Sequence, residues 1–189
     1  MKLNAKQLRQ LEEKRAVGEI RKIKRRPIFF ILENIYDTYN IGGLFRLADA
    51  LAIEKIYLCG ETETPPNSRI KKASIGTYKV VDWQYVKTVK KAIDELYIKK
   101  WEIRSEKFDN VFLQVIAVEQ HPKAINYTAA VYRPPLALIF GNESYGITPE
   151  TLKLADQIVE IPMWGINKSL NVIVSAAIVG YWVVNQLKS

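Results

Sequence analysis

The 189-residue sequence contains a single cysteine, Cys59, and a single histidine, His121. One thiol cannot form a disulfide within the chain. One cysteine and one histidine also nearly exclude a cysteine-rich zinc site or a histidine-dependent triad. We therefore expect no disulfide framework and no metal. A lone thiol also suits a reducing cytoplasm.

Long apolar runs are scarce as well. Residues 1–15 lack the apolar core of a signal peptide, and the longest uncharged apolar run, residues 172–184, is too short to span a bilayer. We therefore expect a cytoplasmic protein with no membrane partner. Hydrophobic residues make up 48% of the chain, which is ample for the core of one α/β domain with a short extension.

Two common nucleotide-binding motifs are missing. Residues 141–148, GNESYGIT, space Gly141 and Gly146 as in a phosphate-binding loop, but Ile147 stands where the lysine is required. No GxGxxG turn is present either, so nucleotide hydrolysis and the usual mode of dinucleotide binding are excluded. What remains is a glycine at a predicted strand end, where ligands of open α/β sheets bind. Glu143 follows it, either as a site residue or as a helix-cap partner.

Positive charge is concentrated at the N-terminus. Residues 1–27 hold ten lysines or arginines against three glutamates, which accounts for seven of the eight net positive charges. A basic arm on a near-neutral body suits contact with a phosphate backbone, because neutralised phosphates release counterions. A solvated helical face and an anionic membrane surface are the alternatives. An imperfect apolar stripe predicts a helical extension over residues 1–26, made of Leu8, Leu11, Val17, Ile20 and Ile23.

Apolar strands alternate with helical patterns through residues 27–189. Strands are predicted at 27–34, 53–60, 79–86, 111–118, 135–141 and 157–162. Helices are predicted at 40–52, at 88–101, from Thr148 onward and after Ser169. Residues 61–77 are interpreted as a polar, proline-bearing connection. This alternation predicts an α/β domain with a mainly parallel sheet and helices on both faces.

Two further stretches are candidate site segments. Residues 161–184 combine a strand end, a polar loop and an apolar helix, and a loop between such apolar segments is suited to bind a ligand through its amides. Ser169 there is either a helix N-cap or a site residue. Residues 34–50 enter a helix with Asn40 or Gly42 near its start, and Arg46 could contact a phosphate bidentately. An ion pair of Arg46 with Asp37 or Asp49 is the alternative.

Together these stretches resemble a known family. Asn40 with Arg46, GNE before Gly146, and IPM followed by SLN are similar, in this order, to the three motifs of the SpoU (TrmH-like) ribose 2′-O-methyltransferases of the SPOUT superfamily. The resemblance runs from about Pro27 to the C-terminus. It implies a C-terminal trefoil knot (the SPOUT fold), S-adenosyl-L-methionine as cofactor and a homodimer that completes the active site. Because general folding rules disfavour knots, the knot rests on the resemblance alone.

The resemblance also implies residue roles. Arg46 is implicated in activating the ribose 2′-hydroxyl, and Asn40, Glu143, Ser169 and Asn171 are expected to place the substrate, the arginine and the cofactor. A guanidinium stays protonated in proteins, so we prefer Arg46 as an electrostatic stabiliser and phosphate clamp over Arg46 as general base. Backbone groups at five positions are expected to hold the cofactor: Val118, Gly141, Ile161, Met163 and Leu170.

The substrate implied by the resemblance is RNA. The chain lacks the separate N-terminal RNA-binding domain of the longer rRNA-directed members, and its basic arm could substitute, which favours tRNA over rRNA. Ile173 and Ser175 depart from the usual pattern after SLN, in a way that affects packing more than chemistry. Three alternatives remain: a non-catalytic RNA-binding protein on the same scaffold, an enzyme of the superfamily that methylates a base nitrogen, and a small-molecule enzyme on a doubly wound sheet.

Overall fold

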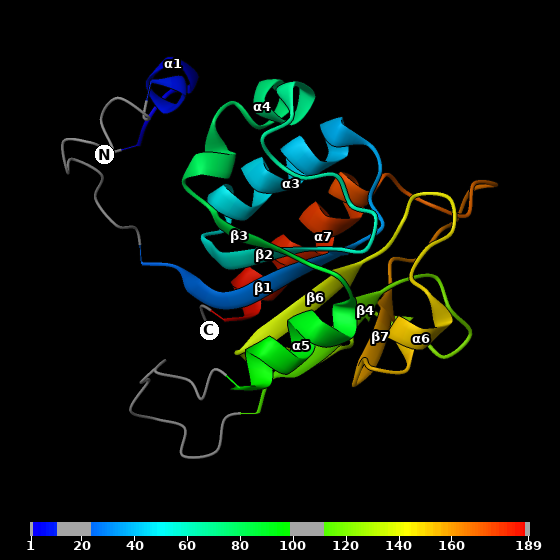
Figure 1. The fold of residues 1–189 in the computed structure, drawn as a ribbon. Coiled ribbons are helices and arrows are strands. Elements are labelled where there is room, and N and C mark those ends of the chain that lie inside the picture. Colours follow the sequence, from blue (N-terminus) through cyan, green and yellow to red (C-terminus); the bar gives the residue numbers. More distant parts are fainter. Residues whose placement is uncertain (1, 11–23, 99–111, 188–189) are drawn as a thin grey trace.

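A seven-stranded sheet forms the centre of the computed structural model, which describes residues 2–10, 24–98 and 112–187 (Figure 1). Its order is β3-β2-β1-β6-β4-β7-β5, and every neighbouring pair is parallel. The strands are β1 Arg26–Glu33, β2 Ile53–Cys59, β3 Asp82–Val86, β4 Gln114–Val118, β5 Ile125–Asn126, β6 Leu136–Phe140 and β7 Gln157–Glu160. The predicted parallel sheet is confirmed. Its middle strand β6 is buried along its whole length, as an apolar run without alternation predicts.

Helices cover both faces of the sheet, as predicted. On one face α3 and α7 pack over the larger apolar cluster, and on the other face α5 and the turn at α6 pack over a second cluster (Figure 1). The helices of the described ranges are α1 Ala5–Arg9, α3 Thr38–Ala50, α4 Ser68–Ser74, the 3₁₀ turn η1 Thr77–Lys79, α5 Val89–Ile98, α6 Pro149–Leu152 and α7 Val172–Gln186. None of them is long and apolar enough to cross a membrane.

Three sequence-based assignments need correction. The strand predicted at 79–86 begins only at Asp82, because Thr77–Lys79 form the 3₁₀ turn η1. The polar connection predicted at 61–77 contains helix α4, whose N-cap Asn67 accepts hydrogen bonds from the backbone N–H of Arg69 and Ile70. Helix α3 begins at Thr38, earlier than predicted, because the Asp37 side chain caps it. Both helices start at an Asx cap, a local signal that apolar periodicity does not reveal.

Helix α3 is held close to α4 by a glycine. A Cβ atom at Gly42 would lie 2.4 Å from Ala73 Cβ and 2.8 Å from the backbone nitrogen of Ser74. At the next residue of α3, a Cβ atom at Gly43 would lie 2.4 Å from Cδ1 of Ile173 in α7. The two glycines therefore let α3 approach both neighbours, and Ile173 serves packing as expected.

The start of the basic extension packs on the body. Helix α1 is closed by a capping box between Asn4 and Gln7. A Cβ at Gly76, before η1, would lie 2.8 Å from the carbonyl oxygen of Leu8, which is half-buried. The other residues of the predicted stripe, Leu11, Val17, Ile20 and Ile23, lie outside the described ranges.

Candidate functional site

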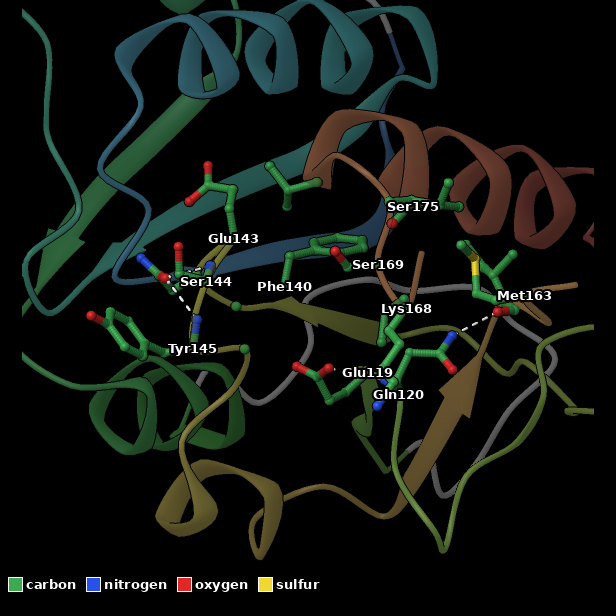
Figure 2. A pocket seen from close by; sticks show the side chains of 17 residues that line it. Glu119, Gln120, Phe140, Glu143, Ser144, Tyr145, Met163, Lys168, Ser169 and Ser175 are labelled. Atoms are coloured by element: carbon green, nitrogen blue, oxygen red, sulfur yellow. Dashed lines mark hydrogen bonds between the residues drawn. The ribbon is translucent and has the colours of Figure 1, made fainter. Parts of the chain in front are cut away.

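A pocket of about 360 Å³ opens at the carboxyl ends of β4, β6 and β7 and at the entry to α7 (Figure 2). Carboxyl ends of parallel strands meet at one sheet edge, which is where open α/β sheets bind ligands. All five positions expected from the family resemblance to hold a cofactor line this pocket: Val118, Gly141, Ile161, Met163 and Leu170. Glu143 and Ser169 line it as well.

The loop after β6 closes on itself through its two glycines. The backbone N–H of Asn142 donates to the carbonyl of Gly146 (3.1 Å), and the Gly146 N–H donates back (2.9 Å). A Cβ at Gly141 would lie 2.4 Å from Gly146 C and from Ile147 N, and Gly146 has a φ of +68°. The glycine spacing that resembles a phosphate-binding loop therefore serves a tight turn at the pocket wall.

Asn142 shapes this turn and was not predicted. Its Oδ1 accepts hydrogen bonds from the backbone N–H of Ser144 (2.8 Å) and Tyr145 (3.0 Å), and its Nδ2 donates to the carbonyl of Asn34 (2.8 Å). The side chain is buried and joins the end of β1 to the loop. In the sequence, the position of Asn142 between the predicted site residues Gly141 and Glu143 could have indicated its role.

Glu33, at the end of β1, holds the N-terminus of helix α6. Its carboxylate accepts hydrogen bonds from the N–H and hydroxyl of Thr148 (both 2.9 Å) and from the hydroxyl of Thr151 (2.6 Å). Thr148 caps α6 and Pro149 opens it, as predicted. Sequence reasoning missed Glu33, although an acidic residue that ends an apolar strand is a recognisable signal of a buried polar network.

The three predicted motifs meet in one chain of hydrogen bonds. Asn40 Nδ2 donates to Oε1 of Glu143 (2.6 Å), and Asn171 Nδ2 donates to Oδ1 of Asn40 (3.0 Å). Asn171 Oδ1 in turn accepts from the N–H of Ile173 (2.9 Å). Asn40 is buried, so both ends of its amide are fixed. Glu143 is bound to Asn40 and caps no helix of the described ranges, so the helix-cap interpretation of Glu143 is wrong.

Ser169 is available to a ligand. The N-cap of α7 is Asn171, so the interpretation of Ser169 as the N-cap is wrong. The N–H of Ser169 donates to Oδ1 of Asn167 (3.3 Å), while its hydroxyl makes no hydrogen bond within the described residues. Figure 2 shows Ser169 beside Phe140 on the pocket wall.

Arg46 lies apart from the pocket. It is exposed on α3, and in the described part of the chain it forms no ion pair. Asp49 pairs with Arg25 instead (3.2 Å), and Asp37 caps α3, so the alternative ion pair of Arg46 is wrong. As far as the described residues go, the guanidinium is therefore available to an anion from solution.

Other polar residues of the pocket were not predicted. Lys168, directly before SLN, lines it, and Gln120 Nε2 donates to the carbonyl of Ile161 (2.6 Å). Glu119 Oε2 accepts from the N–H of Ile147 (2.8 Å), which ties the loop after β4 to the loop after β6. The described residues contain no group of three His, Cys, Asp or Glu placed to hold a metal ion.

Comparisons with known proteins identify relatives. The sequence model of the SpoU rRNA methylase family matches residues 27–181, which confirms the resemblance. A tRNA (guanosine(18)-2′-O)-methyltransferase of Aquifex aeolicus is 26% identical over 182 residues, 93% of this chain and 73% of its own length. An enzyme of the same description from Thermus thermophilus is 26% identical over 166 residues, 88% of this chain and 78% of its own length.

A solved structure supports the fold. The SpoU methyltransferase AviRb from Streptomyces viridochromogenes, in complex with AdoMet, superposes with a TM-score of 0.75 at 22% identity. The match covers 89% of this chain, which spans 61% of that protein. At this level of identity the likeness concerns the fold.

Proposed function

The chain belongs to the SpoU rRNA methylase family, and from this premise we propose that it methylates a ribose 2′-hydroxyl of tRNA with S-adenosyl-L-methionine as methyl donor. The observation that carries the proposal is the hydrogen-bonded series Glu143–Asn40–Asn171, which joins all three motifs at the rim of the pocket. tRNA is favoured over rRNA because the relatives from Aquifex and Thermus are described as tRNA methyltransferases.

The residues of the pocket fit the proposed cofactor. Its volume of about 360 Å³ lies in the range of small-molecule sites, and Gly141 leaves backbone exposed where any side chain would clash. Backbone groups at Val118, Gly141, Ile161, Met163 and Leu170 would hold the cofactor, with the Ser169 hydroxyl and the Lys168 ammonium available to its amino-acid portion. When bound, S-adenosyl-L-methionine supplies a methyl group on a positively charged sulfur.

The acceptor side supplies charge and orientation. A ribose hydroxyl has a pKa above ~12 and is a poor nucleophile at neutral pH, so the alkoxide that develops during transfer needs stabilisation. Arg46 supplies a free guanidinium for this role and for the adjacent phosphate. Asn40, fixed by Asn171, orients the Glu143 carboxylate at the pocket rim.

The proposal includes a homodimer. Trp164 and Ile166, in the loop before α7, are exposed, and so are Val174 and Tyr181 on the helix itself. Exposed apolar side chains gathered around one element suit contact with a second chain. Because Arg46 lies outside the pocket of its own chain, a partner chain would bring the two halves of the site together.

Three further elements of the proposal concern the chain as a whole. The trefoil knot is supported by the three loops that converge on the pocket and by the family. The basic extension, residues 1–26, is proposed to contact RNA, supported by its seven excess positive charges. A tRNA substrate and the lone thiol favour a cytoplasmic location.

Transfer of labelled methyl from S-adenosyl-L-methionine to unmodified tRNA and rRNA, followed by digestion to nucleosides, tests the proposal. A 2′-O-methylated nucleoside from tRNA is the expected result. A base-methylated nucleoside, or cofactor binding without transfer to any RNA, would contradict it. Absence of cofactor binding would favour the non-catalytic RNA-binding alternative.

A further inference from the structure

A second cavity, of about 310 Å³, lies between the β1–α3 turn and the start of α4. Its wall includes Tyr36, Asp37, Tyr39 and Glu63. Tyr39 directly precedes Asn40, whose side chain donates to Glu143 at the rim of the cofactor pocket. One end of the hydrogen-bonded series, Glu143, therefore lines the first pocket, and the neighbour of Asn40, Tyr39, lines the second. None of the residue roles assigned above uses this second cavity.

Aromatic rings are exposed around this cavity. Tyr36 is 46% exposed and Tyr39 54%, whereas Tyr145, which is 86% exposed, lines the first pocket. The Tyr36 hydroxyl donates to Oε2 of Glu61 (2.8 Å), which fixes its ring. This hydrogen bond raises the pKa of Tyr36, and Tyr145 lies near enough to add to the effect. Single-stranded RNA is bound by stacking its bases on such rings.

The frame of the cavity is rigid. Thr62 Oγ1 accepts from the N–H of Ile35 (3.0 Å) and donates to the carbonyl of Leu32 (3.1 Å). The N–H of Glu63 donates to the carbonyl of Ile35 (3.3 Å). These bonds hold the backbone of the loop after β2, including Glu63, against the β1–α3 turn.

The charges of the cavity select for a base rather than a phosphate. Asp37 and Glu63 present carboxylates, which repel phosphate and accept hydrogen bonds, against one cation, Arg69. Asp37 already accepts from the N–H of Tyr39 (2.8 Å), whereas the Glu63 carboxylate accepts no hydrogen bond within the described residues. Guanine presents two adjacent donors, N1–H and the 2-amino group, and a carboxylate can accept from both.

We propose that this cavity receives a guanine base of the acceptor RNA, stacked on Tyr39 and recognised at its donor edge by Glu63. The inference rests on the proposed function, because the base must belong to the RNA strand that is methylated. The volume is at the lower end for small-molecule sites and suits a single base. Tyr39 and Arg46, seven residues apart, share one face of α3, so base and backbone contacts would lie along the same helix.

The test compares tRNA acceptors that carry guanosine, inosine or adenosine at the methylated position. Inosine keeps N1–H and lacks the 2-amino group, while adenosine lacks both donors. For the wild type, kcat/KM should fall from guanosine to inosine to adenosine. Glu63→Gln should lower kcat/KM for guanosine about tenfold or more and leave adenosine unchanged, because a charged hydrogen-bond acceptor is lost.

Two further variants separate stacking from folding. Tyr39→Ala should lower kcat/KM for all three acceptors by about tenfold, and Tyr39→Phe should lower it less than Tyr39→Ala, since the ring is retained. Glu54→Gln, at an exposed position of β2, is the matched control and should behave as the wild type. Cofactor affinity, measured for every variant, reports whether the chain is folded.

Each contrary outcome has a distinct meaning. If the wild type methylates tRNA only at a pyrimidine nucleotide, guanine recognition is overturned and the proposed function stands. If Glu63→Gln retains the wild-type preference among the three acceptors, the role of Glu63 is overturned. If the wild type transfers methyl to no RNA, the proposed function and this inference are both overturned.

Discussion

The proposed cofactor side and the proposed acceptor side of the site are built differently. On the cofactor side, backbone positions from three loops line one pocket, and Gly141 and Gly146 close the central loop within a single chain. On the acceptor side, Arg46 is exposed outside that pocket, and Asn40 is linked to the pocket through the side chains of Glu143 and Asn171. Because the cofactor pocket is built on strand ends, its conformation is set before any ligand binds. The conformation of an exposed side chain such as Arg46 depends on the ligand or partner that it contacts. Changes on the two sides should therefore affect different measurements.

Substitution of Arg46 should have the largest effect, on turnover alone. Arg46→Lys keeps the charge and loses the planar fork, so methyl transfer should fall on the order of 100-fold, as for removal of one donor to a developing oxyanion. The affinity for S-adenosyl-L-methionine should stay unchanged, because Arg46 does not line the pocket. Single-turnover transfer and calorimetric titration measure the two quantities. Unchanged turnover would contradict the role assigned to Arg46.

Substitution of Gly141 should affect the cofactor side instead. In Gly141→Ala the new Cβ would lie 2.4 Å from backbone atoms of Gly146 and Ile147, which cannot move as a side-chain tip can. Such overpacking costs about 1–3 kcal/mol of stability. The turn must shift to relieve the clash, which displaces backbone at the pocket wall, so cofactor affinity should fall on the order of tenfold. Gly165→Ala is the matched control, since no atom of the described residues lies within 4 Å of its Cβ. Equal cofactor affinity of the two variants would refute the tight-turn explanation.

The same division describes what the sequence could predict. Continuous apolar runs marked the buried strands, and the motif order indicated five positions that all line one pocket, because strand ends and backbone loops follow the chain locally. Ser169 and Asn171 are both good caps by residue type. The structure distinguishes them, because Asn171 Oδ1 accepts from the N–H of Ile173 while Asn171 Nδ2 donates to distant Asn40. Helix α4 is too short to show periodicity, so its proline-bearing surroundings suggested a loop. In both cases a short-range Asx cap marks the start of the helix, and apolar periodicity does not reveal such a cap.

Glu33 holds Thr148 and Thr151, which follow the loop at the cofactor pocket. Its substitution should therefore lower the stability of the fold more than the rate of methyl transfer. Glu33→Gln replaces one acceptor oxygen by an amide donor that faces the N–H or hydroxyl of Thr148 or Thr151. A buried donor without an acceptor costs about 1–3 kcal/mol. The Tm should fall on the order of 5 °C in thermal unfolding. Glu54→Gln, at an exposed position, should leave the Tm unchanged.

The smallest expected effect is on folding stability. It arises from buried titratable side chains of the sheet that carries both sides of the site, and it can be measured only at alkaline pH. Burial raises the pKa of the Cys59 thiol well above its ordinary value of 9.0, and burial raises the pKa of Tyr57 to about 12. Both groups stay neutral in the folded chain, while the unfolded chain releases their protons near pH 9 and 10. Stability is therefore complete below about pH 9 and is lost as pH rises above it.

Cys59→Ser removes one of these titrating groups. Each proton released only on unfolding lowers stability by up to about 1.4 kcal/mol per pH unit, so the variant should lose stability less steeply than the wild type between about pH 9 and 11. Urea unfolding over this range measures the slope, which is independent of the packing cost of the substitution at neutral pH. An identical slope would mean that the thiol ionises without unfolding. The sheet around Cys59 in β2 would then open to solvent while the chain stays folded. Such opening would contradict the view that both sides of the site are carried by one rigid sheet.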